Sequence, residues 1–286
     1  VGVNCSLGPR EFAPVIEELS KWTKLPIVAK PNAGLPNPVT NEYDVTPEEF
    51  AESAAKLVKY GIKLTGGCCG TNPDYIRALK KALEPLKYEK NTPMCEAAVC
   101  SAEKVVVINQ PRIIGERINP TGKKLFKEAL RKGDIDYILG QAIEQSQAGA
   151  EILDVNVGLP EIDEKAMMVR TVKALQGVTD LPLQIDSTIP EVIEAALRVY
   201  NGKAIVNSVN GEAGSMEKIL PIVKKYGAAV VGLTLDEDGI PKTAEKRFEI
   251  AERIMNKAIE MGISKENIFI DCLTLTASAE QANVMK

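Results

Sequence analysis

The sequence predicts an α/β protein with two (β/α)8 TIM-type barrels in tandem, both incomplete in this chain. Three observations predict this class. Strand-like and helix-like segments alternate along nearly all of the 286 residues, as they do in proteins with parallel sheets. The alternation lapses once, over residues 86–108. No strand runs into a Rossmann glycine fingerprint, which favours barrels over a doubly wound sheet.

Residues 1–85 contain three strand–helix units, which we interpret as the last three units of a barrel. Strands are expected at residues 1–5, 26–29 and 62–65. The first helix begins at Pro9 and has one apolar face at helical spacing. That face consists of Phe12, Val15, Ile16, Leu19 and Trp22.

The other two helices of this half have clear start signals. Residues 46–49, Thr-Pro-Glu-Glu, form a capping box with proline at the first helical position, and Gly61 ends the helix that follows. The third helix begins at Pro73. Its inward-facing residues are expected to be Ile76, Leu79 and Leu83.

Residues 86–108 are predicted to be an interdomain linker, because they show neither a helical nor a strand period. Six strand–helix units follow, which we interpret as the first six of a second barrel. Because neither half contains eight units, the sequence is interpreted as a segment of a longer protein that is cut inside both barrels. The strands of the second half are expected near residues 111–118, 152–158, 183–187, 204–208, 229–235 and 268–272.

Composition excludes several classes of function. A formal net charge of −4 argues against a protein that binds nucleic acid or a membrane surface. No apolar run approaches the roughly 18 residues of a membrane span. The chain opens without a secretory signal, so we expect a cytoplasmic protein with reduced thiols. The absence of histidine excludes Ser-His and Cys-His catalysis and any histidine metal ligand.

Three cysteines are candidate ligands of a metal ion. Cys68 and Cys69 lie in a glycine-rich corner, residues 66–70, after a predicted strand, and Cys5 ends another strand. The glycines allow the bend that two adjacent side chains need in order to face one point. Three thiolates can hold a zinc ion with one position open. The competing interpretation is that they are small buried apolar residues. No role is assigned to Cys95, Cys100 and Cys272.

Polar residues follow every predicted strand of the second half. In barrels of this kind the chemistry lies at the C-terminal ends of the strands. Each residue by itself is explained by a helix cap or a turn, but the set would form a pocket rich in carboxylates and amides. Such a pocket suits a flat ligand with N–H donors and is a poor phosphate site. The residues are Glu116, Arg117, Asn119, Asp154, Asn156, Asp186, Ser187, Asn207, Ser208, Asn210, Thr234, Asp236, Asp271 and Thr274.

Both halves resemble known domains. The corner at residues 66–70, with Cys5 upstream in Val-Asn-Cys, is similar to the homocysteine-binding barrel of zinc-dependent homocysteine methyltransferases. Residues 115–122, with the polar ends of the next strands, are similar to a pterin-binding barrel. This tandem order is that of the cobalamin-dependent methionine synthases. The resemblance implies that residues 1–85 are the C-terminal part of the zinc barrel and residues 109–286 a truncated barrel for methyltetrahydrofolate.

The resemblance also implies roles for single residues. The zinc ligands would be Cys5, Cys68 and Cys69. The residues that hydrogen-bond the pterin ring and serve in catalysis would be Asp186, Asn207 and Asp271. The same rim would be lined by Glu116, Asn119, Asp154 and Asn156.

The implied reaction moves a methyl group twice. The group passes from 5-methyltetrahydrofolate to cob(I)alamin, and from methylcobalamin to zinc-activated homocysteine, giving methionine and tetrahydrofolate. The cobalamin would sit on a separate module, in cis or in trans, because no cobalamin-binding sequence of the Asp-x-His-x-x-Gly type is present. Neither nucleic acid nor a membrane is expected as a partner.

Two alternatives stay open from the sequence. A pterin enzyme similar to dihydropteroate synthase, or a methyltetrahydrofolate methyltransferase acting on a corrinoid protein, explains the second half but not the three cysteines. A non-catalytic fragment that binds zinc or pterin explains both halves without turnover.

Overall fold

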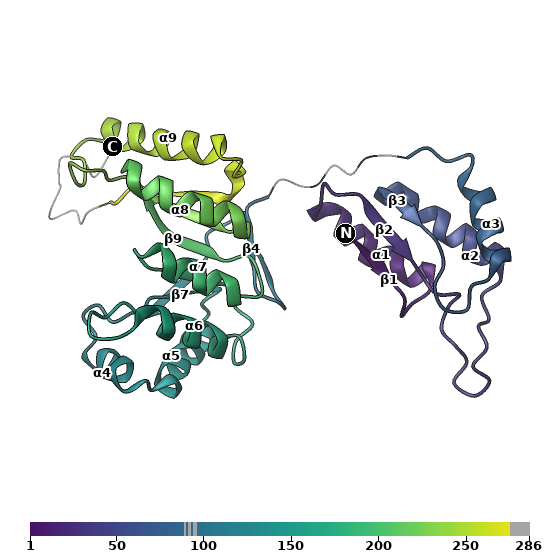
Figure 1. The fold of residues 1–286 in the computed structure, drawn as a ribbon, viewed down its shortest axis with the longest axis horizontal. Coiled ribbons are helices and arrows are strands. Elements are labelled where there is room, and N and C mark those ends of the chain that lie inside the picture. Colours follow the sequence, from purple (N-terminus) through teal and green to yellow (C-terminus); the bar gives the residue numbers. More distant parts are fainter. Residues whose placement is uncertain (89, 91–92, 94–95, 275–286) are drawn as a thin grey trace. The chain divides into compact units, whose positions relative to one another are not determined.

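The computed structural model describes residues 1–88, 90, 93 and 96–274. Cys95 lies outside these residues. The chain divides into two compact units, Val1–Cys95 and Glu96–Lys286 (Figure 1). Within the described ranges, no helix is both long and apolar enough to cross a membrane.

The first unit is a parallel sheet whose strands alternate with helices. Its strand order is β1-β2-β3, and both neighbouring pairs are parallel. The three predicted strand–helix units are therefore present. Their elements are β1 (Gly2–Asn4), α1 (Pro9–Trp22), β2 (Ile27–Lys30), α2 (Pro47–Ala55), the 3-10 helix η1 (Lys56–Tyr60), β3 (Ile62–Thr65) and α3 (Pro73–Leu83).

The start of α2 shows the predicted capping box. The hydroxyl of Thr46 accepts a hydrogen bond from the Glu49 N–H (3.3 Å), and the Glu49 carboxylate accepts one from the Thr46 N–H (3.1 Å). Gly61, in the left-handed region at φ 77°, ends η1. These local signals fix where α2 begins and where η1 ends, because they satisfy backbone groups that the helices themselves leave unpaired.

The buried face of α1 is narrower than predicted. Phe12 and Ile16 are fully buried, whereas Val15 and Trp22 are 45% and 40% exposed.

Helix α3 packs through a different stripe from the predicted one. Leu79 is buried and Leu83 is half-buried, but Ile76 is 47% exposed, so its predicted inward position is wrong. Tyr75 takes the inward position and stands edge-on to Phe50 of α2. An aromatic contact with α2 decides the rotation of α3, and this contact cannot be read from the spacing of α3 alone.

The second unit contains a six-stranded sheet of order β11-β10-β9-β8-β7-β6, in which all neighbouring pairs are parallel. Consecutive strands lie side by side, and a helix follows each strand from β6 to β10, as in a (β/α)8 barrel. The α/β class with parallel sheets is thus confirmed. The elements are β4 (Ala98–Cys100), β5 (Val105–Val107), β6 (Ile114–Ile118), α4 (Lys124–Lys132), α5 (Ile135–Gln147), β7 (Ile152–Val155), α6 (Glu164–Leu175), β8 (Leu183–Asp186), α7 (Pro190–Val199), β9 (Ile205–Asn210), α8 (Ala213–Tyr226), β10 (Ala229–Leu233), α9 (Ala244–Glu260), the 3-10 helix η2 (Lys265–Asn267) and β11 (Ile268–Asp271).

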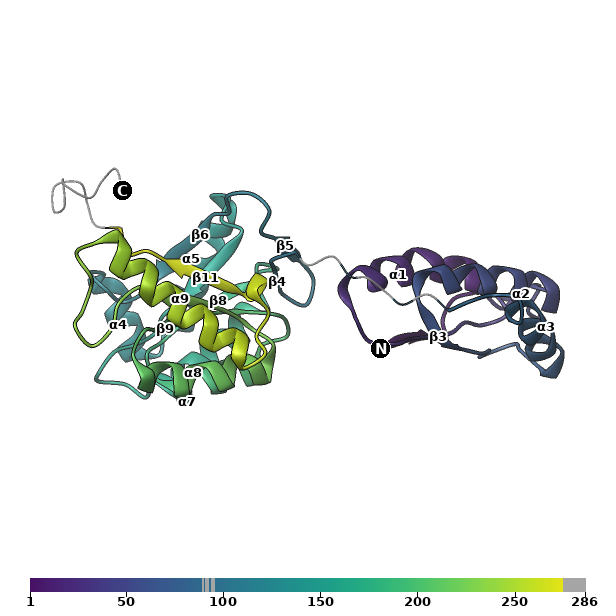
Figure 2. The same ribbon diagram turned by 90° about the horizontal axis from the view of Figure 1, so that it is seen from above.

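Helices cover one face of this sheet. Figures 1 and 2 show them following one another around it. Successive strand residues point to opposite faces, and the helix-facing set is apolar and buried in the main core. On the four central strands it includes Leu153, Val155, Leu183, Ile185, Val206 and Val230.

Residues 98–107 are not the linker that the sequence predicts for residues 86–108. They form an antiparallel hairpin, β4–β5, that belongs to the second unit. Val99 and Val106 of the hairpin are buried against an apolar layer on the helix-free face of the sheet, at Ile152, Ile205 and Ala229. Each hairpin strand has three residues, too few to establish a period in the sequence.

Candidate functional site

Cys5, Cys68 and Cys69, the thiol cluster, meet where β1 and β3 end. Cys5 follows β1 with a left-handed backbone (φ 66°), and its N–H donates to the Lys30 carbonyl at the end of β2 (3.0 Å). The Cys68 N–H donates to the Pro31 carbonyl (2.9 Å). Main-chain hydrogen bonds from neighbouring strand ends therefore hold the corner in place.

Asn32 is the side chain that fixes Cys69. It is only 4% exposed, and its Oδ1 accepts the N–H of Cys69 (3.0 Å). The Cys69 carbonyl accepts from the Ala33 N–H (2.9 Å). Asn32 is not among the predicted site residues, although it follows β2 as the cysteines follow β1 and β3.

Two glycines of the corner are required by close contacts. A Cβ on Gly70, whose φ is +77°, would lie 2.3 Å from Cγ of Tyr43. A Cβ on Gly67 would lie 2.3 Å from Oγ1 of Thr71, whose hydroxyl closes the corner by donating to a main-chain carbonyl (2.7 Å). Gly66 has no neighbour within 4 Å of such a Cβ, so contacts do not explain the glycine there.

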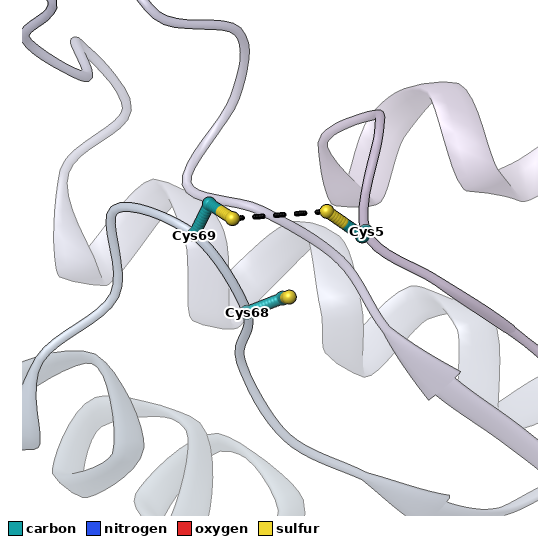
Figure 3. Close-up of side chains that lie close together, drawn as sticks. All are labelled: Cys5, Cys68 and Cys69. Carbon is teal, nitrogen blue, oxygen red and sulfur yellow. Dashed lines mark hydrogen bonds between the residues drawn. The ribbon is translucent and has the colours of Figure 1, made fainter.

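The spacing of the sulfur atoms fits a tetrahedral metal site. Sγ of Cys5 and Sγ of Cys69 are 3.7 Å apart, and all three sulfur atoms lie within 4.8 Å of one another (Figure 3). Thiolates bound tetrahedrally to one zinc ion at about 2.3 Å would be about 3.8 Å apart. The spacing of the three cysteines therefore fits a zinc ion and would leave one of its four positions open.

The thiols also affect each other's ionisation. A hydrogen bond with the Ser6 backbone lowers the pKa of Cys5, whereas the hydrogen bond with Cys5 raises the pKa of Cys69. Opposite directions are expected for adjacent thiols, because a second thiolate beside the first is unfavourable. A bound cation removes that cost, so the cluster suits a metal ion better than it suits three free thiolates.

The second candidate site lies on the helix-free face of the six-stranded sheet. Asp154 of β7 and Gln184 of β8 are direct partners there, and Asp186 of β8 is the partner of Asn207 of β9 one layer nearer the C-terminal strand ends. Together with Asn156 these residues form the strand-end cluster. The apolar layer under the β4–β5 hairpin lies toward the N-terminal ends of the same strands, so the polar layers stand above an apolar floor.

Asp154 is a buried carboxyl group with two amide partners. It is 4% exposed, and its Oδ1 accepts a hydrogen bond from Gln184 Nε2 (2.5 Å). Burial raises the pKa of Asp154 to about 6, and the charges of Asp186 and Glu116 act in the same direction, while hydrogen bonds from Gln184 and Asn207 oppose the rise. This carboxyl group therefore titrates close to neutral pH.

Asp186 lies at the outer layer of the cluster. Its Oδ2 accepts a hydrogen bond from Asn156 Nδ2 (2.9 Å), and Asn156 Oδ1 accepts the Gly158 N–H (2.8 Å). Burial also raises the pKa of Asp186. Carboxylates and amides at adjacent strand ends offer acceptors and donors to the edge of a flat polar ligand.

Two predicted rim residues lie on β6 and in the loop that follows it, Glu116 on the strand and Asn119 in the loop. Glu116 is exposed and forms an ion pair with Lys123 (2.9 Å), although its charge raises the pKa of Asp154 and Asp186. Asn119 accepts the N–H of Thr121 (2.8 Å), so it stabilises its own turn.

Two other predicted residues lie at the side of the sheet formed by β10 and β11, opposite β6. Asp271 is exposed at the end of the edge strand β11, and its Oδ1 accepts the Leu273 N–H (2.7 Å). Asp236 is buried and contacts Arg253 (3.4 Å). The structure thus groups the predicted residues of β7, β8 and β9 and gives Asn119, Asp236 and Asp271 local partners.

Two further residues near the cluster, Gln184 and Glu164, are not among the predicted site residues. Gln184 precedes Asp186 by two residues, so strand alternation would have placed it on the same face. Glu164, at the start of α6, accepts a hydrogen bond from the Ser187 hydroxyl (2.6 Å) and contributes to the raised pKa of Asp186. No strand-end pattern could have found a residue on a helix.

Comparison with known proteins links both clusters to families. Residues 115–285, more than half of the chain, match the family model described as pterin binding enzyme. The chain belongs to the pterin-binding enzyme family. Residues 1–83 of this pterin-binding enzyme match a second family model, homocysteine S-methyltransferase. The first match contains the strand-end cluster and the second contains the thiol cluster.

Curated relatives match both halves together. The methionine synthase of Mycobacterium leprae is 36% identical over 307 residues, which cover 100% of this chain and 25% of the relative. The methionine synthase of Mycobacterium tuberculosis is 36% identical over 293 residues, which cover 98% of this chain and 25% of the relative. The predicted similarity to methionine synthases is confirmed, and the chain spans about a quarter of the length of these relatives.

Solved structures of dihydropteroate synthases are also similar to the pterin-binding enzyme. The Xanthomonas albilineans enzyme with 4-aminobenzoic acid is 21% identical, with a TM-score of 0.48, over 62% of this chain and 66% of that chain. The Vibrio fischeri ES114 enzyme is 16% identical, with a TM-score of 0.46, over 62% of this chain and 68% of that chain.

Proposed function

We propose that this chain carries the two substrate sites of a cytoplasmic, cobalamin-dependent methionine synthase. A methyl group would pass from 5-methyltetrahydrofolate to cob(I)alamin, and from methylcobalamin to homocysteine, giving methionine and tetrahydrofolate. The observation that carries the proposal is the thiol cluster, whose three sulfur atoms lie within 4.8 Å of one another in the region that matches homocysteine S-methyltransferase. A pterin enzyme without a homocysteine site has no use for this cluster.

The proposed architecture is two incomplete (β/α)8 barrels. Residues 1–85 would be the last three units of the homocysteine barrel. The six-stranded sheet would belong to the first six units of the pterin barrel. The β4–β5 hairpin would close the floor of the pterin barrel. Consecutive parallel strands in both sheets support this arrangement. A cobalamin-binding module, in cis or in trans, would serve both sites.

In the first unit, Cys5, Cys68 and Cys69 would hold zinc. When bound, zinc favours the thiolate form of a substrate thiol, which is the nucleophilic form. The task of the chain is to keep the three sulfur atoms at the required spacing. Asn32 does so for Cys69 and the Pro31 carbonyl does so for Cys68, each through a backbone N–H.

In the second unit, the strand-end cluster would bind methyltetrahydrofolate. Carboxylate oxygens of Asp154 and Asp186 would accept N–H groups of the pterin, while Asn156 and Asn207 would orient its edge, and Asp271 would contact it from β11. The N5 amine is a poor leaving group until it is protonated or strongly hydrogen-bonded. Holding the ring at several points lets a proton donor meet N5 in one defined geometry.

Zinc content tests the first half of the proposal. We expect about one tightly bound zinc ion per wild-type chain and little or none in Cys69→Ala. The matched control is Cys272→Ala, which removes an exposed cysteine of the other unit and should leave the zinc content unchanged. Less than about one zinc ion in the wild type, or equal zinc in Cys69→Ala, would overturn the homocysteine site.

A further inference from the structure

Gln184 is a neutral side chain in the inner layer of the strand-end cluster. It is 7% exposed. Its ladder partner on β7 is Asp154, and its partner on β9 is Ile205, which belongs to the apolar floor. Gln184 therefore lies at the boundary between the floor and the polar rim, one layer below Asp186.

The contact between Gln184 and Asp154 is short and enclosed. Nε2 of Gln184 donates to Oδ1 of Asp154 at 2.5 Å, and Asp154 is 4% exposed. Because strand pairing places the two residues side by side, this hydrogen bond sets the direction of the carboxyl group from the neighbouring strand. Hydrogen bonds to charged groups in such buried positions are stronger than those between neutral groups.

We propose that Gln184 is a positioning residue that keeps the Asp154 carboxylate oriented and ionised to accept N–H groups of a bound reduced pterin. This role rests on the proposed pterin site of the second unit. Gln184 acts through Asp154 and does not itself contact the ligand.

The electrostatic surroundings of Asp154 explain why a donor is needed. Glu116 on β6 and Asp186 on β8 are the acidic groups that act on it, and both disfavour its ionised form, as burial does. Against these effects stand the amides of Gln184 on β8 and Asn207 on β9. The hairpin beneath contributes Val99 and Val106, which are apolar. Two neutral amides thus offset part of the effect of burial and of two acidic neighbours on the pKa of Asp154.

Removal of the Gln184 donor should move the titration of Asp154 to higher pH. A hydrogen bond to the charged form lowers a carboxyl pKa, so its loss raises the pKa. Gln184→Met keeps the length of the side chain without the donor and should raise the pKa by about one unit. If the ionised form binds pterin, affinity should be lost at a higher pH than in the wild type and should recover in alkaline buffer.

The test measures affinity for 5-methyltetrahydrofolate from pH 5.5 to 8.5 by calorimetry on the full chain. Gln184→Met should bind about five-fold more weakly than the wild type at pH 6 and about equally at pH 8.5, from a shift of about one pKa unit. Gln184→Glu should also move the loss of affinity to higher pH, because a second carboxylate beside Asp154 disfavours its ionised form.

Gln176→Met is the matched control. Gln176 bonds main-chain groups of Val172, Val199 and Asn201 and has no partner in the cluster among the described residues. Its loss should lower stability without moving the pH profile. The role of Gln184 would be overturned if Gln184→Met lost affinity for 5-methyltetrahydrofolate at the same acidic pH as the wild type. It would also be overturned if Gln176→Met moved that pH as far as Gln184→Met does.

A ligand-free measurement separates this inference from the proposed function. Carboxyl ¹³C resonances, with Asp154→Asn used for assignment, should report a higher pKa of Asp154 in Gln184→Met than in the wild type. No difference would overturn the inference. A difference in a protein that binds no methyltetrahydrofolate at any pH would overturn the pterin site, and with it the ligand named here, while the pairing of Gln184 with Asp154 would stand.

Discussion

The thiol cluster and the strand-end cluster are built in opposite ways. The three sulfur atoms sit on corners beyond the strands, and Cys69 is exposed. Their positions depend on backbone hydrogen bonds and on two glycines that tolerate close contacts. In the strand-end cluster, Asp154, Gln184, Asp186 and Asn207 stand on paired strands, where alternation and register aim them at one face, and Asn156 directly follows β7.

The difference shows how each site meets the cost of its charges. The thiols repel one another when ionised, and the cost is removed only when a cation binds. The carboxyl groups of the strand-end cluster are already desolvated, which raises the pKa of Asp154 and of Asp186. Amide donors stabilise them before any ligand arrives. The proposed metal site would therefore depend on its ion, whereas the strand-end cluster is organised in advance.

The largest expected effect comes from Cys5→Ala. Loss of one of three thiolate ligands should lower zinc affinity by about 1000-fold or more, measured by competition with a chelator. Affinity for methyltetrahydrofolate should not change, because the two clusters belong to separate compact units. If pterin binding fell together with zinc binding, the two sites could not be treated as independent.

Asp186→Ala should have the next largest effect. It removes a carboxylate at the outer layer of the cluster, so affinity for methyltetrahydrofolate should fall by about 10- to 100-fold, the range for a hydrogen bond to a charged group. Glu194→Ala, which removes a surface carboxylate paired with Lys225, is the control. Equal affinity in a calorimetric titration of wild type and Asp186→Ala would remove Asp186 from the site.

Asn32→Ala tests how far the thiol cluster depends on its support. The Cys69 N–H would lose its acceptor, and zinc affinity should fall by about 10-fold, as for other groups that orient metal ligands. Asn32→Asp retains an acceptor oxygen and should restore part of the affinity. Unchanged zinc affinity in Asn32→Ala would show that the main chain alone holds the corner.

Asp154→Asn tests how much stability the protein loses by burying the ionised carboxyl group of Asp154 before a ligand binds. The folded-state pKa of about 6 lies above the ordinary value of 3.8, so this carboxyl group contributes stability below about pH 4 and loses it as pH rises through 6. The substitution should therefore raise the free energy of unfolding by about 1 kcal/mol at pH 7.5 and change it little at pH 4. Urea unfolding at both pH values measures this, and destabilisation at pH 7.5 would contradict it.

Much of the molecule follows from local patterns in the sequence. The alternation of strands and helices predicts parallel sheets, and the capping box at residues 46–49 predicts the start of α2. Cys68 and Cys69, and likewise Asp186 and Asn207, are found because each follows a short apolar run. These signals are local, since the period of a strand and the cap of a helix depend on residues within a few positions.

Only the tertiary structure decides the rest. It brings Cys5 to 3.7 Å from Cys69, 64 residues away, pairs Gln184 with Asp154, and turns Ile76 outward in favour of Tyr75. It also makes a hairpin of residues 98–107, whose three-residue strands gain their apolar partners from β7, β9 and β10. In each case the determining contact joins segments far apart in the chain, and such contacts leave no period in the sequence of either segment.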